Sequence, residues 1–141
     1  MLRILGQFSI FGTKASVGRI ASTTPIPEGR IVQIGLARRV PEPDSWCYES
    51  PRYRFHQEEI DDEVRDFISV HARLGPALKK ADAGLKYAFL TLCPVEQSNE
   101  EEFACVLSHE TLQALSALGV ALQIAPEPVM PDAPYWTERK Q

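Results

Sequence analysis

An apolar stripe at helical spacing, with a dense run of carboxylates on the opposite side, constrains the fold of this chain more than any other feature. Six of the nine residues from Glu58 to Asp66 are acidic. The apolar residues recur at about 100° per residue and share one narrow arc; they are Ile60, Val64, Phe67, Ile68, Leu74 and Leu78. The pattern predicts a long amphipathic helix over about 58–74 that packs by its apolar side and exposes its acids. Gly75 and Pro76 are expected to kink or restart it.

Strand signals flank this helix on both sides. The predicted strands show apolar alternation or short apolar runs bounded by turn residues, and they cover about 2–12, 31–40, 46–49, 85–93, 103–107 and 120–124. The fourth of these runs is apolar on both faces, so it is expected to be a central strand that Pro94 ends. A short helical turn is predicted at 15–21, and another helix is expected from the N-cap Ser108 to Gly119.

This order of elements predicts an α+β fold, with a mixed, largely antiparallel sheet, one long acidic helix and one or two shorter helices packed on it. Residues 1–125 are expected to form a single α+β domain, because a length of 141 residues suits one core. Residues 126–141 contain four prolines and are interpreted as a Pro-rich C-terminal tail, in which Tyr135 and Trp136 could dock on the domain.

The net charge of −4 conceals a strong asymmetry along the chain. Residues 1–55 carry +4, residues 56–110 carry −7 and residues 111–141 carry −1. The basic residues of the first part are scattered, and an acidic chain repels phosphate backbones, so nucleic acid is not an expected partner. A partner selected by charge is expected to be basic.

The cysteines and the N-terminus bear on the compartment. Cys47, Cys93 and Cys105 are an odd, widely spaced set, which fits reduced thiols better than a disulfide framework and predicts a cytoplasmic protein. The first twelve residues lack a signal-peptide pattern, and no apolar run reaches transmembrane length, so no membrane association is expected.

Several short motifs occur in a fixed order around the predicted elements. They are Pro25-Ile26-Pro27-Glu28-Gly29, then Trp46 with Tyr48 and Ser50, the long helix, Leu107-Ser108-His109-Glu110-Thr111-Leu112, and Leu118-Gly119-Val120. Over about residues 2–125 this pattern resembles a family of small bacterial proteins known only as a domain of unknown function. Members of such families recur beside polymorphic toxins, so the resemblance implies an immunity role.

Catalytic and metal-binding signals are weak in the sequence. His56, His71 and His109 lack the spacing of a zinc site, and no phosphate-binding loop occurs, so no metal, cofactor or catalytic residue is predicted. His71 lies on the apolar arc and is interpreted as packing. The alternative is a small enzyme or metabolite-binding domain with a cleft near Trp46–Phe55, in which Cys47 would act with His56 or His109.

The favoured hypothesis is a non-enzymatic protein-binding module, most simply an immunity-type protein that neutralises a cognate toxin by direct contact. The expected partner-facing residues are Glu58, Glu59, Asp62, Glu63 and Asp66, with Trp46, Tyr48 and Tyr53 as aromatic anchors. Two plainer interpretations stay open: the acids could only complement the helix dipole, and the aromatic residues could only fill the core. A homodimer is also left open.

Overall fold

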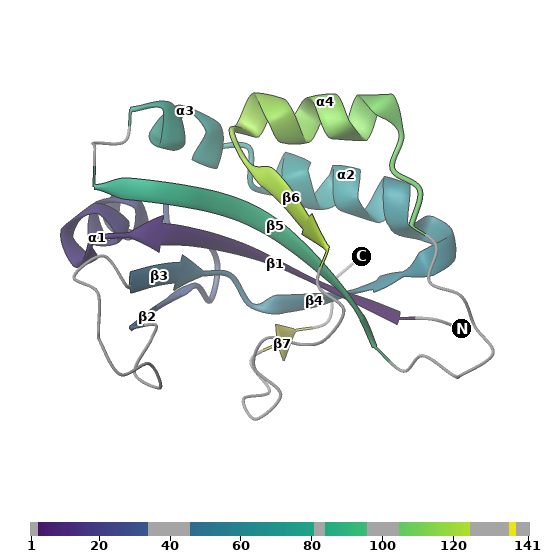
Figure 1. Cartoon of the computed structure of the whole chain (residues 1–141), viewed down its shortest axis with the longest axis horizontal. Helices are drawn as coiled ribbons and strands as arrows, with labels where there is room; N and C mark the ends of the chain where they lie inside the picture. Colours follow the sequence, from purple (N-terminus) through teal and green to yellow (C-terminus); the bar gives the residue numbers. More distant parts are fainter. Residues whose placement is uncertain (1–2, 34–45, 81–83, 96–104, 125–135, 138–141) are drawn as a thin grey trace.

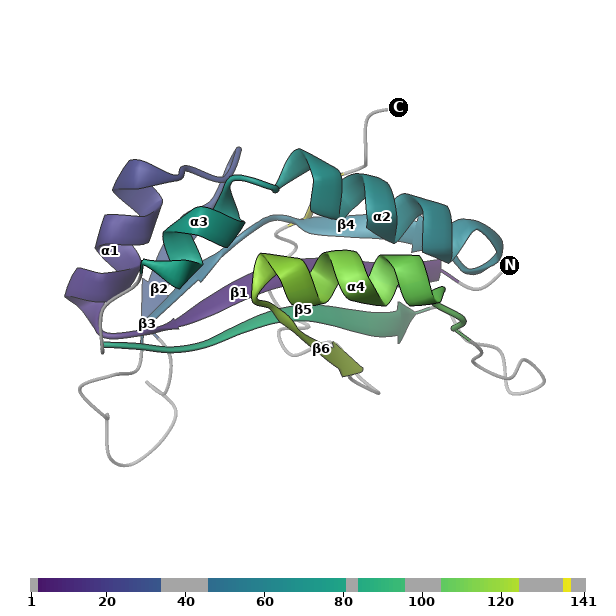
Figure 2. The same cartoon turned by 90° about the horizontal axis from the view of Figure 1, so that it is seen from above.

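The computed structural model of the chain describes residues 3–33, 46–80, 84–95, 105–124 and 136–137. Within these residues one mixed sheet is covered on one face by helices, as Figures 1 and 2 show. The strands are β1 (Arg3–Gly12), β2 (Arg30–Gln33), β3 (Trp46–Glu49), β4 (Arg52–His56), β5 (Leu85–Val95), β6 (Ala121–Ile124) and β7 (Trp136–Thr137). The helices are α1 (Lys14–Thr23), α2 (Ile60–Val70), α3 (Leu74–Lys79) and α4 (His109–Leu118), and a 3₁₀ turn, η1 (Gln57–Glu59), precedes α2. The predicted α+β class is confirmed.

Strand β1 is the axis of the sheet. Antiparallel β5 pairs with it along one edge, and antiparallel β3 and β4 share the other edge, β3 opposite Ser9–Gly12 and β4 opposite Arg3–Gly6. Antiparallel β2 extends the sheet beyond β3, while β6 and β7 add parallel pairs to β5 and β4. The strands predicted over 31–40 and 46–49 are found as β2 and β3, which pair with each other antiparallel, and residues 34–40 lie outside the described ranges.

Ser50 joins β3 to β4 without a gap in the pairing with β1. Its side chain is fully buried. The Ser50 hydroxyl accepts the Phe8 N–H at 3.0 Å, and the Ser50 N–H donates to the Phe8 carbonyl at 3.0 Å. This bridge matters because Pro51 has no N–H with which to continue a ladder. Ser50 is therefore a structural residue of the strand break.

The core lies between β1 and the helices. Phe8 of β1 stacks on Phe67 of α2 with ring centroids 4.7 Å apart, and Phe55 of β4 meets Phe67 at 5.7 Å. Gly6 is required beside them, because a Cβ at that position would lie 2.1 Å from the buried Phe55 ring. The acidic helix is thus anchored to the sheet by its aromatic and aliphatic side.

The long helix is shorter than predicted. α2 ends at Val70, the chain turns at residues 71–73, and α3 starts at Leu74, so Pro76 lies in the first turn of a new helix. Proline is tolerated there, whereas in a continuous helix its ring would clash with the carbonyl of Ala72, four residues earlier. The restart was expected, but the break precedes Gly75 rather than falling on it.

The strands differ from the prediction in three places, and the prediction for the C-terminal tail is partly met. β4 was not predicted. Residues 105–107 are not a strand, although one was expected over 103–107. β5 does not end before Pro94 but runs to Val95, where β6 no longer pairs with it, and an unpaired strand edge tolerates proline. In the tail, Trp136 docks on the domain through β7, and Tyr135 lies outside the described residues.

Both ends of α4 match the sequence expectation. Ser108 is the N-cap, and its hydroxyl accepts the Thr111 N–H at 3.2 Å. Gly119 ends the helix in the left-handed conformation with φ 80°. Among the described residues, the helices are too short and too polar to cross a membrane.

Candidate functional site

Four carboxylates of η1 and α2 are exposed. They are Glu58, Glu59, Asp62 and Asp66. The opposite side of α2 is buried in the core, so the helix cannot roll to hide these acids. In Figure 2 the N-terminal end of α2 lies at the opposite end of the molecule from α1 and α3.

Glu63 does not face outward, and this expectation was wrong. The residue is only 7% exposed. One carboxylate oxygen accepts the backbone N–H of His56 at 3.2 Å, and the other lies 3.0 Å from His56 Nδ1. Glu63 therefore ties the first turn of α2 to the end of β4, and it is removed from the partner-facing set.

Asp61 also has an internal role. Its carboxylate accepts the N–H of Ser108 at 2.6 Å and receives a hydrogen bond from the Arg65 guanidinium at 2.6 Å. The pKa of Asp61 is lowered to about 2. The main cause is the hydrogen bond from the Ser108 backbone, and the next is the hydrogen bond with the Thr111 side chain. The same guanidinium reaches Asp62 at 3.5 Å. Asp61 and Arg65 thus join α2 to the start of α4.

The three aromatic candidates differ in their exposure. Tyr48 is only 3% exposed, and its hydroxyl accepts the Ile26 N–H. A partner cannot reach this buried side chain, so the prediction that Tyr48 is an aromatic anchor was wrong. Tyr53 is half-buried and packs edge-on against Phe67 at 4.5 Å. Trp46 is half-buried, with the Lys14 ammonium 4.9 Å from its ring centroid.

The structure does not support Cys47 as a nucleophile. Burial raises the pKa of its thiol to about 12, with Glu49 contributing further, so the thiolate is scarce at neutral pH. Cys47 pairs with Phe11 of β1 and His56 pairs with Arg3. These β1 positions are eight residues apart, or roughly 26 Å at about 3.3 Å per residue. A Cys47–His56 pair is therefore excluded, and His109 is exposed at the start of α4.

His71 is buried, as its place on the apolar arc suggests. It is 5% exposed, and its Nδ1 lies 2.8 Å from the Phe67 carbonyl, so Nδ1 carries the proton. Its Nε2 has no hydrogen-bond partner within the described structure. Burial lowers the pKa of His71, which keeps the ring neutral.

One cluster has the residue types of a metal site. A ring nitrogen of His56 and carboxylate oxygens of Glu59 and Glu63 lie within 4.8 Å of one another. Imidazole and carboxylate are ligands for zinc and related ions. Neither the His-x-x-x-His nor the Cys-x-x-Cys spacing of zinc sites occurs in this cluster, which is assembled across the strand-to-helix junction and was therefore not predicted from the sequence.

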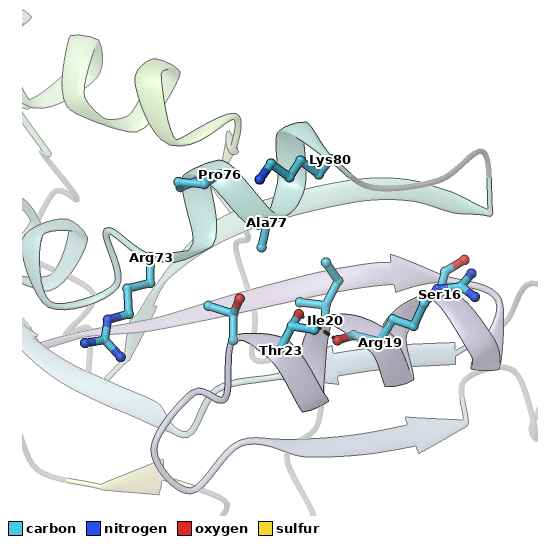
Figure 3. Close-up of a pocket in the computed structure, with 9 residues that line it drawn as sticks. Ser16, Arg19, Ile20, Thr23, Arg73, Pro76, Ala77 and Lys80 are labelled. Atoms are coloured by element: carbon cyan, nitrogen blue, oxygen red, sulfur yellow. Dashed lines mark hydrogen bonds between the residues drawn. The ribbon is translucent and has the colours of Figure 1, made fainter.

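A pocket of about 370 Å³ lies between α1 and α3, as Figure 3 shows. Nine residues line it: Ser16, Arg19, Ile20, Thr23 and Thr24 from α1 and its end, and Arg73, Pro76, Ala77 and Lys80 from α3 and its flanks. Sequence reasoning missed this site because its basic residues are distant in sequence and do not form a recognisable motif. A weak signal existed in the spacing of Arg19 and Thr23, which places both on one side of a helix.

No family model, curated protein or solved structure matches this chain. Three features of the described residues bear on function instead: the acidic surface of η1 and α2, the His56 cluster and the α1–α3 pocket.

Proposed function

We propose that this protein is a non-enzymatic binding module that engages a basic protein through the acidic face, defined as Glu58, Glu59, Asp62 and Asp66. The observation that carries the proposal is the exposure of these four acids on a helix whose other side is fixed in the core. Such a surface is held in place before a partner arrives, so little ordering entropy is lost on binding.

The charge balance of the helix supports this proposal. Asp61 and Glu63 have clear structural partners, and Asp62 pairs with Arg65 at 3.5 Å while its side chain stays 85% exposed. The helix dipole stabilises acids near the helix N-terminus by about 0.3–1 kcal/mol each. The dipole therefore favours Glu58, Glu59 and Asp62 at the helix start, whereas Asp66 lies beyond the first turn and gains little from it. Mutual repulsion among these acids is a cost that a basic partner would offset, and complementary charge would speed encounter.

The proposed class is an immunity-type protein that binds a cognate toxin. Its support is the family resemblance, together with an acidic surface suited to a basic cleft. All three cysteines carry thiols rather than disulfides, and two of them are buried, which is consistent with a cytoplasmic, reducing compartment. The half-exposed parts of Trp46 and Tyr53 are secondary contact candidates.

The experiment compares capture of partners from the native host by two variants with equal charge changes. Glu58→Gln/Glu59→Gln neutralises two of the four acids of the acidic face. Glu28→Gln/Glu110→Gln neutralises two exposed acids outside that face, of which Glu110 lies 3.8 Å from Arg65. We expect a basic protein to be captured by the wild type and the control pair and to be lost or strongly reduced with the first pair. Equal capture by all three would remove the acidic face from the binding site.

A further inference from the structure

The α1–α3 pocket has an unusual charge composition for a chain with net charge −4. Three of its nine lining residues are basic, namely Arg19, Arg73 and Lys80, and none of the nine is acidic. In the view of Figure 3, Arg19 and Arg73 lie at opposite ends of the pocket with their guanidinium groups turned outward, and Lys80 lies along α3 between them. Like charges gathered around one concavity raise the local potential for an anion.

The rest of the lining suits a small organic ligand. Ile20, Pro76 and Ala77 supply an apolar wall. The Thr23 hydroxyl donates to the Arg19 carbonyl at 2.8 Å, and Ser16 accepts from the Thr13 hydroxyl at 2.9 Å, so these hydroxyl contacts are already made within α1 and its cap. Recognition would therefore come from the cations and the apolar wall. A volume of about 370 Å³ lies within the range of small-molecule sites.

We infer that the α1–α3 pocket binds a small phosphorylated molecule, with its phosphate held by Arg73 and Lys80 and its organic part against the α3 wall. Phosphate suits the site better than a carboxylate does, because it carries up to two charges and offers three oxygens to several donors at once. Arg73 and Lys80 are both exposed, so each can reorient onto an anion, and the ordering of each long side chain offsets part of that contact.

This site is independent of the proposed protein-binding surface. The pocket lies between α1 and α3, at the end of the molecule away from the start of α2 (Figure 2). The inference would therefore hold even if the acidic face bound nothing.

The test is an NMR titration of the full chain with adenosine monophosphate and pyrophosphate, using adenosine as the uncharged control. We expect saturable shifts of amides in α1 and α3 with the two phosphorylated probes, and much weaker effects with adenosine. Lys80→Gln and Arg73→Gln should each weaken binding by about tenfold or more, the loss of one charge-assisted hydrogen bond.

Lys79→Gln is the matched control, because Lys79 is an exposed neighbour of Lys80 that does not line the pocket. It should leave the dissociation constants within about twofold, the size expected of a general charge effect. Three results would overturn the inference: no saturable shifts with either phosphorylated probe, equal binding of adenosine, or an equal loss with Lys79→Gln and Lys80→Gln.

Discussion

Replacing Glu63 by alanine should destabilise the protein far more than replacing Glu58, although both are acids of the same helical segment. Glu63 is 7% exposed and accepts the backbone N–H of His56 at 3.2 Å. Glu58 is exposed at the helix start, where only the dipole favours it. The difference separates an acid that holds the fold from an exposed acid of the acidic face.

The magnitude follows from the contacts that are lost. A hydrogen bond to a charged group contributes about 1.5–3 kcal/mol, and water cannot easily replace it where the acceptor is buried. The second contact, to the imidazole, adds less because the His56 side chain is 46% exposed. We therefore expect Glu63→Ala to lower the free energy of unfolding by about 1.5–3 kcal/mol and Glu58→Ala to change it by about 0.5 kcal/mol or less.

Urea denaturation followed by circular dichroism at pH 7 measures this difference directly. The m-value should be unchanged. In a thermal melt, Tm should fall by roughly 3–12 °C for Glu63→Ala, at about 2–4 °C per kcal/mol for a chain of this size. Equal losses for the two variants, or a larger loss for Glu58→Ala, would refute the assignment of Glu63 to the fold.

Three further predictions concern the interior and its titration. Gly6→Ala should cost about 1–3 kcal/mol in urea denaturation, because its Cβ collides with the Phe55 ring; unchanged stability would contradict that packing. Because burial lowers the pKa of His71, its unfolded form binds protons first, so the urea midpoint should fall as pH drops below about 6.5. His71→Leu should make the urea midpoint less dependent on pH in this range. The same pH dependence in the variant and the wild type would contradict this role of His71. The depressed pKa of Asp61 adds stability that is present above about pH 4 and lost toward about pH 2. Asp61→Asn should therefore lower stability at pH 7 and weaken the acid dependence, and equal acid titrations of both proteins would contradict the Ser108 contact.

Local sequence signals predicted the elements that are set by nearest neighbours. Ser108 and Gly119 bound α4 because capping and left-handed backbone depend on residues within one turn. The apolar arc predicted that α2 packs by that side for the same reason. β4 was missed because its pairing is set by β1, almost fifty residues earlier, and Pro51 directly before it reads as a break.

The candidate site was only partly predictable, because periodicity says which side of a helix is polar but not what each polar residue contacts. Glu63 was predicted to face outward, yet it turns toward His56 across the β4–α2 junction. The α1–α3 pocket is lined by Arg19 and Arg73, which come to one site only when α1 and α3 pack against each other. Such long-range pairings carry no local signature in one sequence.

The most direct test of the central claim is the salt dependence of affinity for the captured partner, measured for the wild type and for a variant with Glu58, Glu59, Asp62 and Asp66 replaced by their amides. An acidic face that binds a basic protein predicts weaker binding of the wild type as salt rises, and for the variant both a higher Kd and a flatter salt dependence. The same Kd and the same salt dependence for both proteins would contradict the account.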